Sequence, residues 1–92
     1  MSEHSKLQNK ILKYIRAIGG VGSNVVVASR AGTHDIIACI EGRYVSIEVK
    51  VWPDKPSDLQ IEHGALVLEA GGIVIYAYSL QDVINGLSLS CP

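Results

Sequence analysis

The sequence predicts an α/β fold in which a mixed central sheet is flanked by helices, in the order α-β-β-β-α-β-α. Three observations predict it. Apolar residues recur at helical spacing near the start of the chain, residues 44–51 alternate between apolar and polar as a strand does, and a helical stretch at 57–70 precedes the apolar run 73–78. The 92 residues are enough for one domain, which we place at residues 1–92.

The first predicted element is an amphipathic helix from Ser2 to Ile18, which Gly19 and Gly20 end. Its apolar stripe consists of Leu7, Ile11, Ile15 and Ile18. Another side of the helix carries basic residues at helical spacing: Lys6, Lys10, Lys13 and, a turn later, Arg16. Two interpretations of this basic side are open, an ordinary solvated face and a row of contacts to phosphates.

Three strands follow the helix. Residues 21–24 have turn chemistry, and the β-branched run Val25 to Ser29 is predicted to be a buried strand. The second strand is Ile36 to Ile40, and a hairpin turn at 41–43 leads to the third, Tyr44 to Val51. Because side chains alternate along a strand, Val45, Ile47, Val49 and Val51 face one way, and Tyr44, Ser46, Glu48 and Lys50 face the other.

The second half of the chain predicts a βαβ unit. Two prolines make residues 52–56 a loop, and Ser57 with Gln60 fits a capping box that opens a helix running to about Ala70. Its predicted apolar face consists of Ile61, Ala65 and Leu68, and His63 is predicted to point outward. Residues 71–72 are glycines that stop the helix, residues 73–78 form a strand of parallel-sheet type, and Ser79 caps a last helix to about residue 85.

Composition excludes several classes of protein. No apolar run approaches the length of a membrane span and no signal peptide is visible, so we expect a cytoplasmic protein without a membrane partner. Cys39 and Cys91 are expected to be reduced thiols. The net charge of −1 does not indicate a general phosphate binder, so charge is informative only locally. The sequence has no nucleotide-binding loop and no hydrolase triad motif.

Three residues combine into a candidate metal site. Glu48 and Lys50 share one face of the third strand, and the preceding strand brings Asp35 toward the same region. An exposed ion pair is the ordinary interpretation of Glu48 and Lys50. Two carboxylates beside a lysine also suit a hard divalent ion that polarises a phosphate.

These residues resemble the motif of the PD-(D/E)xK nuclease superfamily and, within it, a stand-alone VRR-NUC (virus-type replication-repair nuclease) domain. The matching segments are Gly32-Thr33-His34-Asp35, Ile47-Glu48-Val49-Lys50 and Ser57-Asp58-Leu59-Gln60. His34 stands where the superfamily usually has proline. The resemblance spans nearly the whole chain and implies a restriction-endonuclease-like core.

The resemblance also implies a site and a reaction, the metal-dependent hydrolysis of DNA phosphodiester bonds by an endonuclease. Mg²⁺ or Mn²⁺ would be held by Asp35, Glu48 and the backbone carbonyl of Val49, with Lys50 and Gln60 acting beside them. Family members often add a helix glutamate to the metal site. Glu3 is the candidate here, and an exposed N-terminal glutamate is the competing interpretation, because Glu3 and Gln8 are five residues apart and do not share a helical face.

We expect contacts to DNA from Lys6, Lys10, Lys13, Arg30 and Lys55. The short chain and its high apolar content favour a homodimer, and the resemblance favours branched DNA such as a four-way (Holliday) junction in DNA repair. The alternative is a catalytically inactive DNA-binding or scaffold protein on the same fold. A zinc hydrolase that uses His4, His34 and His63 has no recognisable ligand spacing.

Overall fold

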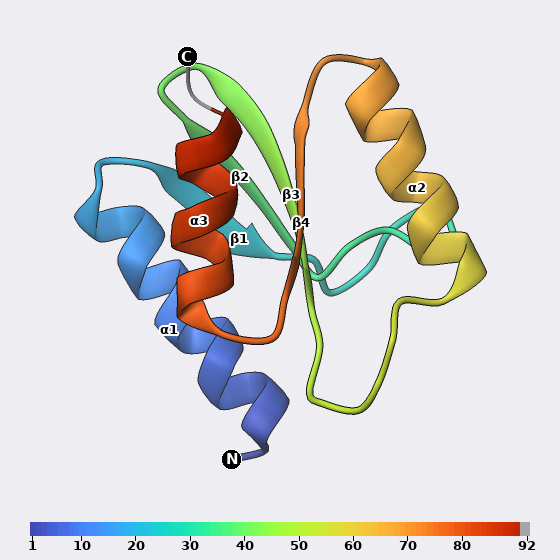
Figure 1. Ribbon diagram of the computed structural model, residues 1–92, viewed down its shortest axis with the longest axis horizontal. Helices are drawn as coiled ribbons and strands as arrows, with labels where there is room; N and C mark the ends of the chain where they lie inside the picture. Colours follow the sequence, from blue (N-terminus) through green and yellow to red (C-terminus); the bar gives the residue numbers. More distant parts are fainter. Residues whose placement is uncertain (91–92) are drawn as a thin grey trace.

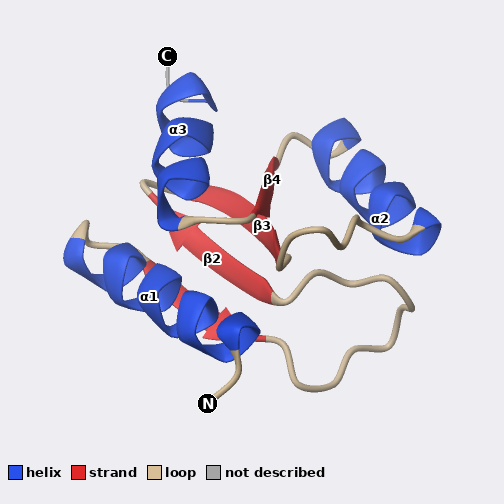
Figure 2. Ribbon diagram, turned by 60° about the horizontal axis from the view of Figure 1, so that its bottom comes forward, coloured by secondary structure: helices blue, strands red, loops and turns tan. Residues whose placement is uncertain are grey.

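A four-stranded mixed sheet separates two layers of helices in the computed structural model (Figures 1 and 2), which describes the backbone of residues 1–90 and the side chains of residues 1–88. The elements are α1 (Glu3–Ala17), β1 (Val21–Asn24), β2 (Ile36–Ile40), β3 (Arg43–Val49), α2 (Asp58–Glu69), β4 (Ile73–Ala77) and α3 (Leu80–Ser90). Helices α1 and α3 cover one face of the sheet, and α2 lies on the other. The predicted order of elements is confirmed.

The sheet has the order β1-β2-β3-β4, with the first two pairings antiparallel and the last parallel. Glu41 and Gly42 form the two-residue turn of the β2–β3 hairpin, and both have positive φ, 51° and 77°. Such turns match the twist of the strands that they join. The crossover from β3 through α2 to β4 sets Glu48 beside Tyr76, as the predicted βαβ unit requires.

The apolar core lies between the sheet and the α1–α3 layer. Ile11 and Ile15 of α1 are fully buried there, as predicted, and pack with the inward side chains of β2, β3 and β4. Ile18, predicted to join them, is 41% exposed because α1 ends at Ala17 and Ile18 caps it. Leu12 takes part in the core instead.

The prediction of a strand from Val25 to Ser29 is wrong. Strand β1 is formed by Val21–Asn24, the segment predicted to be a turn, and Val26 and Val27 are 91% and 89% exposed in the following loop. The reason is packing against α1. A Cβ atom on Gly22 would lie 3.3 Å from side-chain atoms of Ile15 and Leu12, so only a residue without a side chain lets the helix approach this strand so closely.

The predicted apolar face of α2 is also wrong. Ile61 and Leu68 are 52% and 59% exposed, and Ala65 is exposed with them. Helix α2 instead turns Gly64 to the sheet, where the Tyr76 hydroxyl and the His34 ring occupy the space that a Cβ atom would take. The polar groups beneath α2 therefore decide which side of the helix is buried.

The last helix begins as predicted, because Ser79 Oγ accepts a hydrogen bond of 3.2 Å from the Asp82 N–H, but it continues to Ser90 and not to residue 85. The thiol of Cys39 is free and exposed, whereas Cys91 lies outside the described residues. Within residues 1–90 no helix has the length and apolar character needed to cross a membrane.

Gly32 joins the loop before β2 to α2, and this contact generates a prediction. Gly32 has φ +83°, and a Cβ atom there would overlap the backbone of Leu59, whereas Gly42 has φ +77° with open space around it. Both substitutions by alanine carry the backbone penalty of about 1 kcal/mol. We expect Gly32→Ala to cost clearly more, about 3 kcal/mol or above, in urea denaturation. Equal losses for Gly32→Ala and Gly42→Ala would contradict the tight contact.

Candidate active site

The chain brings Asp35, Glu48 and Lys50 together at one end of the sheet. Asp35 immediately precedes β2, and Glu48 is the penultimate residue of β3, only 3% exposed on the side of the sheet that faces α2. Lys50 follows β3, and its N–H still bonds to the carbonyl of Ala77 in β4 at 2.9 Å. The alternation predicted for the third strand therefore continues to Lys50.

Hydrogen bonds to the backbone hold the two carboxylates together. The Val49 N–H donates to Asp35 Oδ2 at 3.0 Å, and the Asp35 N–H donates to Glu48 Oε1 at 3.2 Å. Each acid is thus positioned by the main chain beside the other acid. The Asp35 side chain keeps 27% of its surface exposed, so the pair is open to solvent from its side.

Glu48 is the more buried acid, and its surroundings disfavour its charged form. Burial raises the pKa of Glu48, and the negative charge of Asp35 raises that pKa further. Lys50 opposes this effect, with its Nζ 3.4 Å from Glu48 Oε2. The net direction is upward, so two acids are held close together at an electrostatic cost.

Gln60 both caps α2 and contacts the site. Its Oε1 accepts a hydrogen bond of 2.8 Å from the Ser57 N–H, which completes the predicted capping box. Its Nε2 donates to Glu48 Oε2 at 2.9 Å. The two ends of one amide therefore serve the helix and the site at once, so the cap and the active-site contact do not compete.

His34 is fully buried. It stands where the nuclease motif that this sequence resembles usually has proline. Its Nε2 donates to the Gln60 carbonyl at 2.8 Å, and Ser46 Oγ donates to its Nδ1 at 2.7 Å. Burial lowers the pKa of His34, which favours the neutral ring that this pattern requires. The ring thereby links β3 to the first turn of α2, one residue before Asp35.

His63 does not point outward, contrary to the prediction. Its ring meets that of His34 edge to face, with centroids 4.8 Å apart. Both ring nitrogens are buried and have no hydrogen-bond partner among residues 1–88. The prediction failed because it followed the apolar stripe of α2, and the helix buries its opposite side.

Helix α1 contributes His4 to the site and turns Glu3 elsewhere. His4 Nε2 lies 3.0 Å from Asp35 Oδ2, whereas Glu3 pairs with Lys6 at 3.6 Å and is 76% exposed. In the sequence this contact has only a weak signal, because His4 follows the candidate Glu3 in the first turn of the predicted helix. From the sequence, His4 was a candidate only as a zinc ligand.

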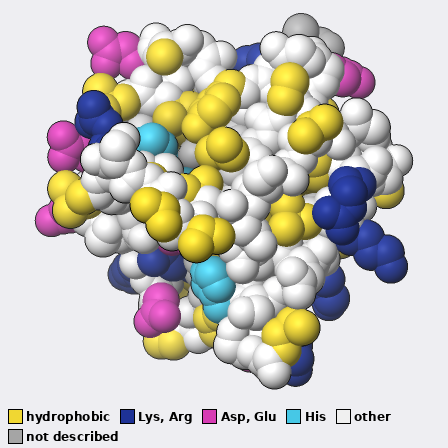
Figure 3. Space-filling view, turned by 180° about the vertical axis from the view of Figure 1, so that it is seen from behind, with side chains coloured by type: hydrophobic (Ala, Val, Ile, Leu, Met, Phe, Trp, Pro, Cys, Tyr) yellow, Lys and Arg dark blue, Asp and Glu magenta, His cyan; other side chains and the backbone are white. Residues whose placement is uncertain are grey.

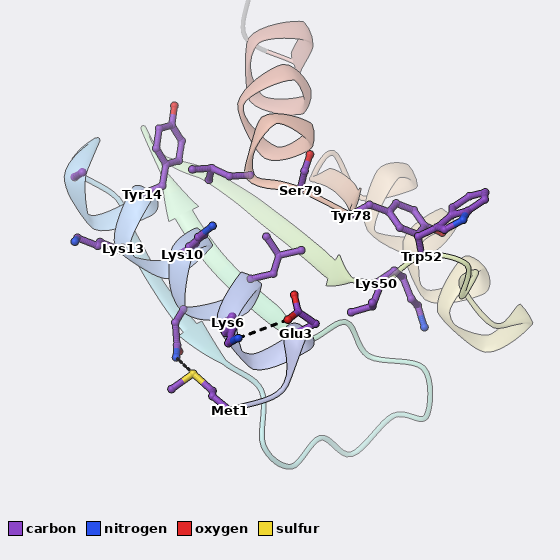
Figure 4. A pocket seen from close by; sticks show the side chains of 15 residues that line it. Met1, Glu3, Lys6, Lys10, Lys13, Tyr14, Lys50, Trp52, Tyr78 and Ser79 are labelled. Carbon is purple, nitrogen blue, oxygen red and sulfur yellow. Dashed lines mark hydrogen bonds and ion pairs between the residues drawn. The ribbon is translucent and has the colours of Figure 1, made fainter.

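The predicted DNA-contacting residues fall in three places. Lys6, Lys10 and Lys13 line a groove of about 950 Å³ that also contains Lys50 (Figure 4). Arg30 instead borders a smaller hollow of about 370 Å³ beside Tyr44 and Leu66. Lys55 is exposed on the loop after β3. Only the lysines of α1 are therefore joined to the acids by a continuous surface, through Lys50.

The donor atoms suit a hard divalent cation. The carboxylates of Asp35 and Glu48 repel each other. A bound divalent ion would reduce this repulsion, and their oxygen atoms are the ligands that such an ion prefers. No three His, Cys, Asp or Glu side chains within the described residues gather around one point, so an ion here would also need a backbone carbonyl or water. The same finding argues against the zinc site considered from His4, His34 and His63.

No family model matches this sequence, and no curated protein matches it. A solved structure titled "VRR_NUC domain" is similar to the chain with a TM-score of 0.82, at 20% sequence identity over 96% of this chain and 97% of the other. The chain therefore has the fold of that VRR_NUC domain over 96% of its length. The fold predicted from the resemblance is confirmed.

The raised pKa of Glu48 generates a prediction about stability. A carboxyl with a raised pKa in the folded state loses stability as pH rises from its ordinary value of 4.5 through its folded value. Glu48→Gln removes this pH dependence, although its amide cannot accept both hydrogen bonds that Glu48 receives from the Asp35 N–H and from Gln60. We therefore expect the thermal midpoint of wild type, relative to that of the variant, to fall as pH rises from 4.5 to 7, by roughly 4–8 °C for each ~1 kcal/mol. Well below pH 4.5, where wild-type Glu48 is protonated, the difference should not change with pH.

Calorimetric scans across this pH range check the expectation without added metal. Glu62→Gln changes an exposed carboxylate on α2 and is the matched control, for which no such change with pH is expected. A difference between Glu48→Gln and wild type that stays constant from pH 4.5 to 7 would show that ionised Glu48 is not costly.

Proposed function

We propose that this protein is a metal-dependent endonuclease that hydrolyses DNA phosphodiester bonds. The observation that carries the proposal is the pair of carboxylates, Asp35 and Glu48, held together by backbone hydrogen bonds with the Lys50 ammonium 3.4 Å from Glu48. An ordinary surface ion pair explains neither the second acid nor the near-complete burial of Glu48. The fold supports the same conclusion.

Asp35, Glu48 and the carbonyl of Val49 would hold Mg²⁺ or Mn²⁺. Support for Val49 comes from strand geometry, because the N–H and C=O of one strand residue point to the same edge, and the Val49 N–H points at Asp35. When bound, such an ion polarises a phosphate and lowers the pKa of water. His4 would hold Asp35 Oδ2 from the side of α1.

Lys50 and Gln60 would act around these acids. The Lys50 side chain is 16% exposed, so its ammonium is largely shielded from water and its charge acts strongly on a nearby phosphate. In the proposed reaction Lys50 orients the attacking water or offsets negative charge that develops on the phosphate oxygens. Gln60 fixes the orientation of Glu48 through its 2.9 Å hydrogen bond.

Substitutions separate the roles of Asp35 and Lys50. We expect Asp35→Ala to lose Mn²⁺ binding and at least about a hundredfold in cleavage rate, since the ion supplies several kcal/mol to the transition state. Lys50→Ala should lose cleavage but keep Mn²⁺ binding, because removing the positive charge of Lys50 does not weaken the attraction between the carboxylates and Mn²⁺. Isothermal titration calorimetry with Mn²⁺ and a DNA cleavage assay measure the two properties.

Glu62→Ala, at an exposed position of α2, is the control that should cut and bind like wild type. Unchanged turnover in Asp35→Ala would contradict the proposed metal site. Absence of cleavage by the wild-type protein with both Mg²⁺ and Mn²⁺ would favour the inactive DNA-binding protein on this fold.

We further propose that the nuclease is a homodimer that prefers branched DNA such as four-way junctions. The support is the apolar row on the outer side of α2, Ile61, Ala65 and Leu68, which has helical spacing and no cover from the described part of the chain. Figure 3 shows hydrophobic side chains spread over a broad face of the molecule, with a cluster of basic side chains at its right edge and others elsewhere on the rim. If two copies of the chain pack against each other through this row, their two active sites have a fixed symmetric arrangement.

Light scattering tests the dimer. At micromolar concentration we expect twice the mass of one chain, and a single-chain mass for the double variant Ile61→Lys/Leu68→Lys, which places charges on the proposed contact. The variant should also lose any preference for a four-way junction over linear duplex. A wild-type monomer, or equal cleavage of both DNAs by wild type, would contradict this part of the proposal.

A further inference from the structure

The groove beside the active site combines positive charge with an exposed aromatic ring. Figure 4 shows its walls, which come from the basic side of α1, the start of the loop after β3 and the turn between β4 and α3. Lys50 lies in this groove and also contacts Glu48, so the groove begins at the proposed catalytic residues. None of these features is needed to hold the carboxylates.

Positive charge is concentrated in the groove although the chain as a whole carries −1. Lys6, Lys10, Lys13 and Lys50 line it, against Glu3 as its acidic residue. With a helix rise of about 1.5 Å per residue, the three lysines of α1 span roughly 10 Å along the groove, enough for more than one phosphate of a DNA strand. The lining therefore suits a segment of phosphate backbone lying along α1.

Trp52 lies across the groove from the lysines of α1 and on the same side as Lys50 (Figure 4). It is 76% exposed and touches Tyr78 edge to face, with centroids 6.3 Å apart, so the indole is supported but uncovered. Tyr78 is held in turn by its hydroxyl, which donates to the Asp54 carbonyl at 2.6 Å. A supported, uncovered aromatic face next to lysines is the arrangement that stacks nucleic-acid bases.

We propose that this groove binds an unpaired DNA strand, with a base stacked on Trp52 and the phosphates along Lys6, Lys10 and Lys13. Within a duplex, base faces are covered by neighbouring bases, so an aromatic platform gains little from paired DNA. The inference rests on the proposed nuclease function and adds a second kind of branched substrate to the fully paired four-way junction, namely DNA with an unpaired strand, such as a flap, next to the cleaved bond. Lys50, shared by groove and site, would place that bond at the acids.

Trp52 is the chain's one tryptophan, so its fluorescence reports directly on this site. The full chain is titrated in EDTA with a thymidine 12-mer and, separately, with a blunt duplex of equal length. We expect the single strand to quench the emission and to bind more tightly than the duplex. By fluorescence anisotropy of labelled DNA, Trp52→Ala should weaken single-strand binding roughly tenfold, and Trp52→Phe should restore most of the affinity.

Two controls make the result specific. Tyr44→Ala removes an aromatic ring that is 46% exposed outside the groove and should leave single-strand binding unchanged. Lys10→Gln/Lys13→Gln should lower the slope of log affinity against log salt by about 1.4, from about 0.7 per lost phosphate contact on single strands. Thermal unfolding of each variant confirms that it is folded.

The outcomes separate this inference from the proposed function, because binding is measured without a metal ion. Equal quenching by duplex and single strand, or wild-type affinity in Trp52→Ala, overturns the groove assignment, and Trp52 would then fit a contact to a protein partner. If wild type cuts no DNA with Mn²⁺, the nuclease proposal fails, while the titrations in EDTA still decide whether the groove binds an unpaired strand.

Discussion

Two hydrogen bonds between main chain and carboxylate determine the geometry on which the rest of the site depends. The Val49 N–H holds Asp35, and the Asp35 N–H holds Glu48. Because strand backbones are stiff, the acids cannot move apart without breaking the end of the β2–β3 pair. Burial raises the pKa of Glu48, and the like charge of Asp35, which is kept beside it, raises that pKa further. A cation would lower the energy of such a site.

Helix α2 is tied to this pair through the first turn, and not through its apolar residues. The Gln60 side chain joins the Ser57 cap to Glu48, and its carbonyl receives hydrogen bonds from His34 and Tyr76. Buried polar groups need such partners, so this network dictates how the helix rotates on the sheet. The apolar side of α2 is consequently left outside.

The helices cover the two faces of the sheet to different extents. One face of the sheet builds the core with α1 and α3, while α2 covers only β3 and β4 of the other face. Strand β2 therefore leaves Ile37 and Cys39 exposed, and Ile61 and Leu68 of α2 are exposed as well. The basic groove lies along α1, so the DNA groove and the dimer contact that we propose involve different helices.

Sequence alone determined the order of elements, the β2–β3 hairpin and the crossover, because alternation, turn residues and caps are local signals. It also predicted that Asp35, Glu48 and Lys50 lie close together, as they do in the candidate site. Tertiary structure decided what these signals do not contain. Gly22 became part of β1 since α1 packs on it, and Val26 with Val27 was left in a loop despite strand propensity. His4 and His34 reached their partners across 31 and 26 residues of chain, a separation that no periodic pattern reports, because only packing brings such segments into contact.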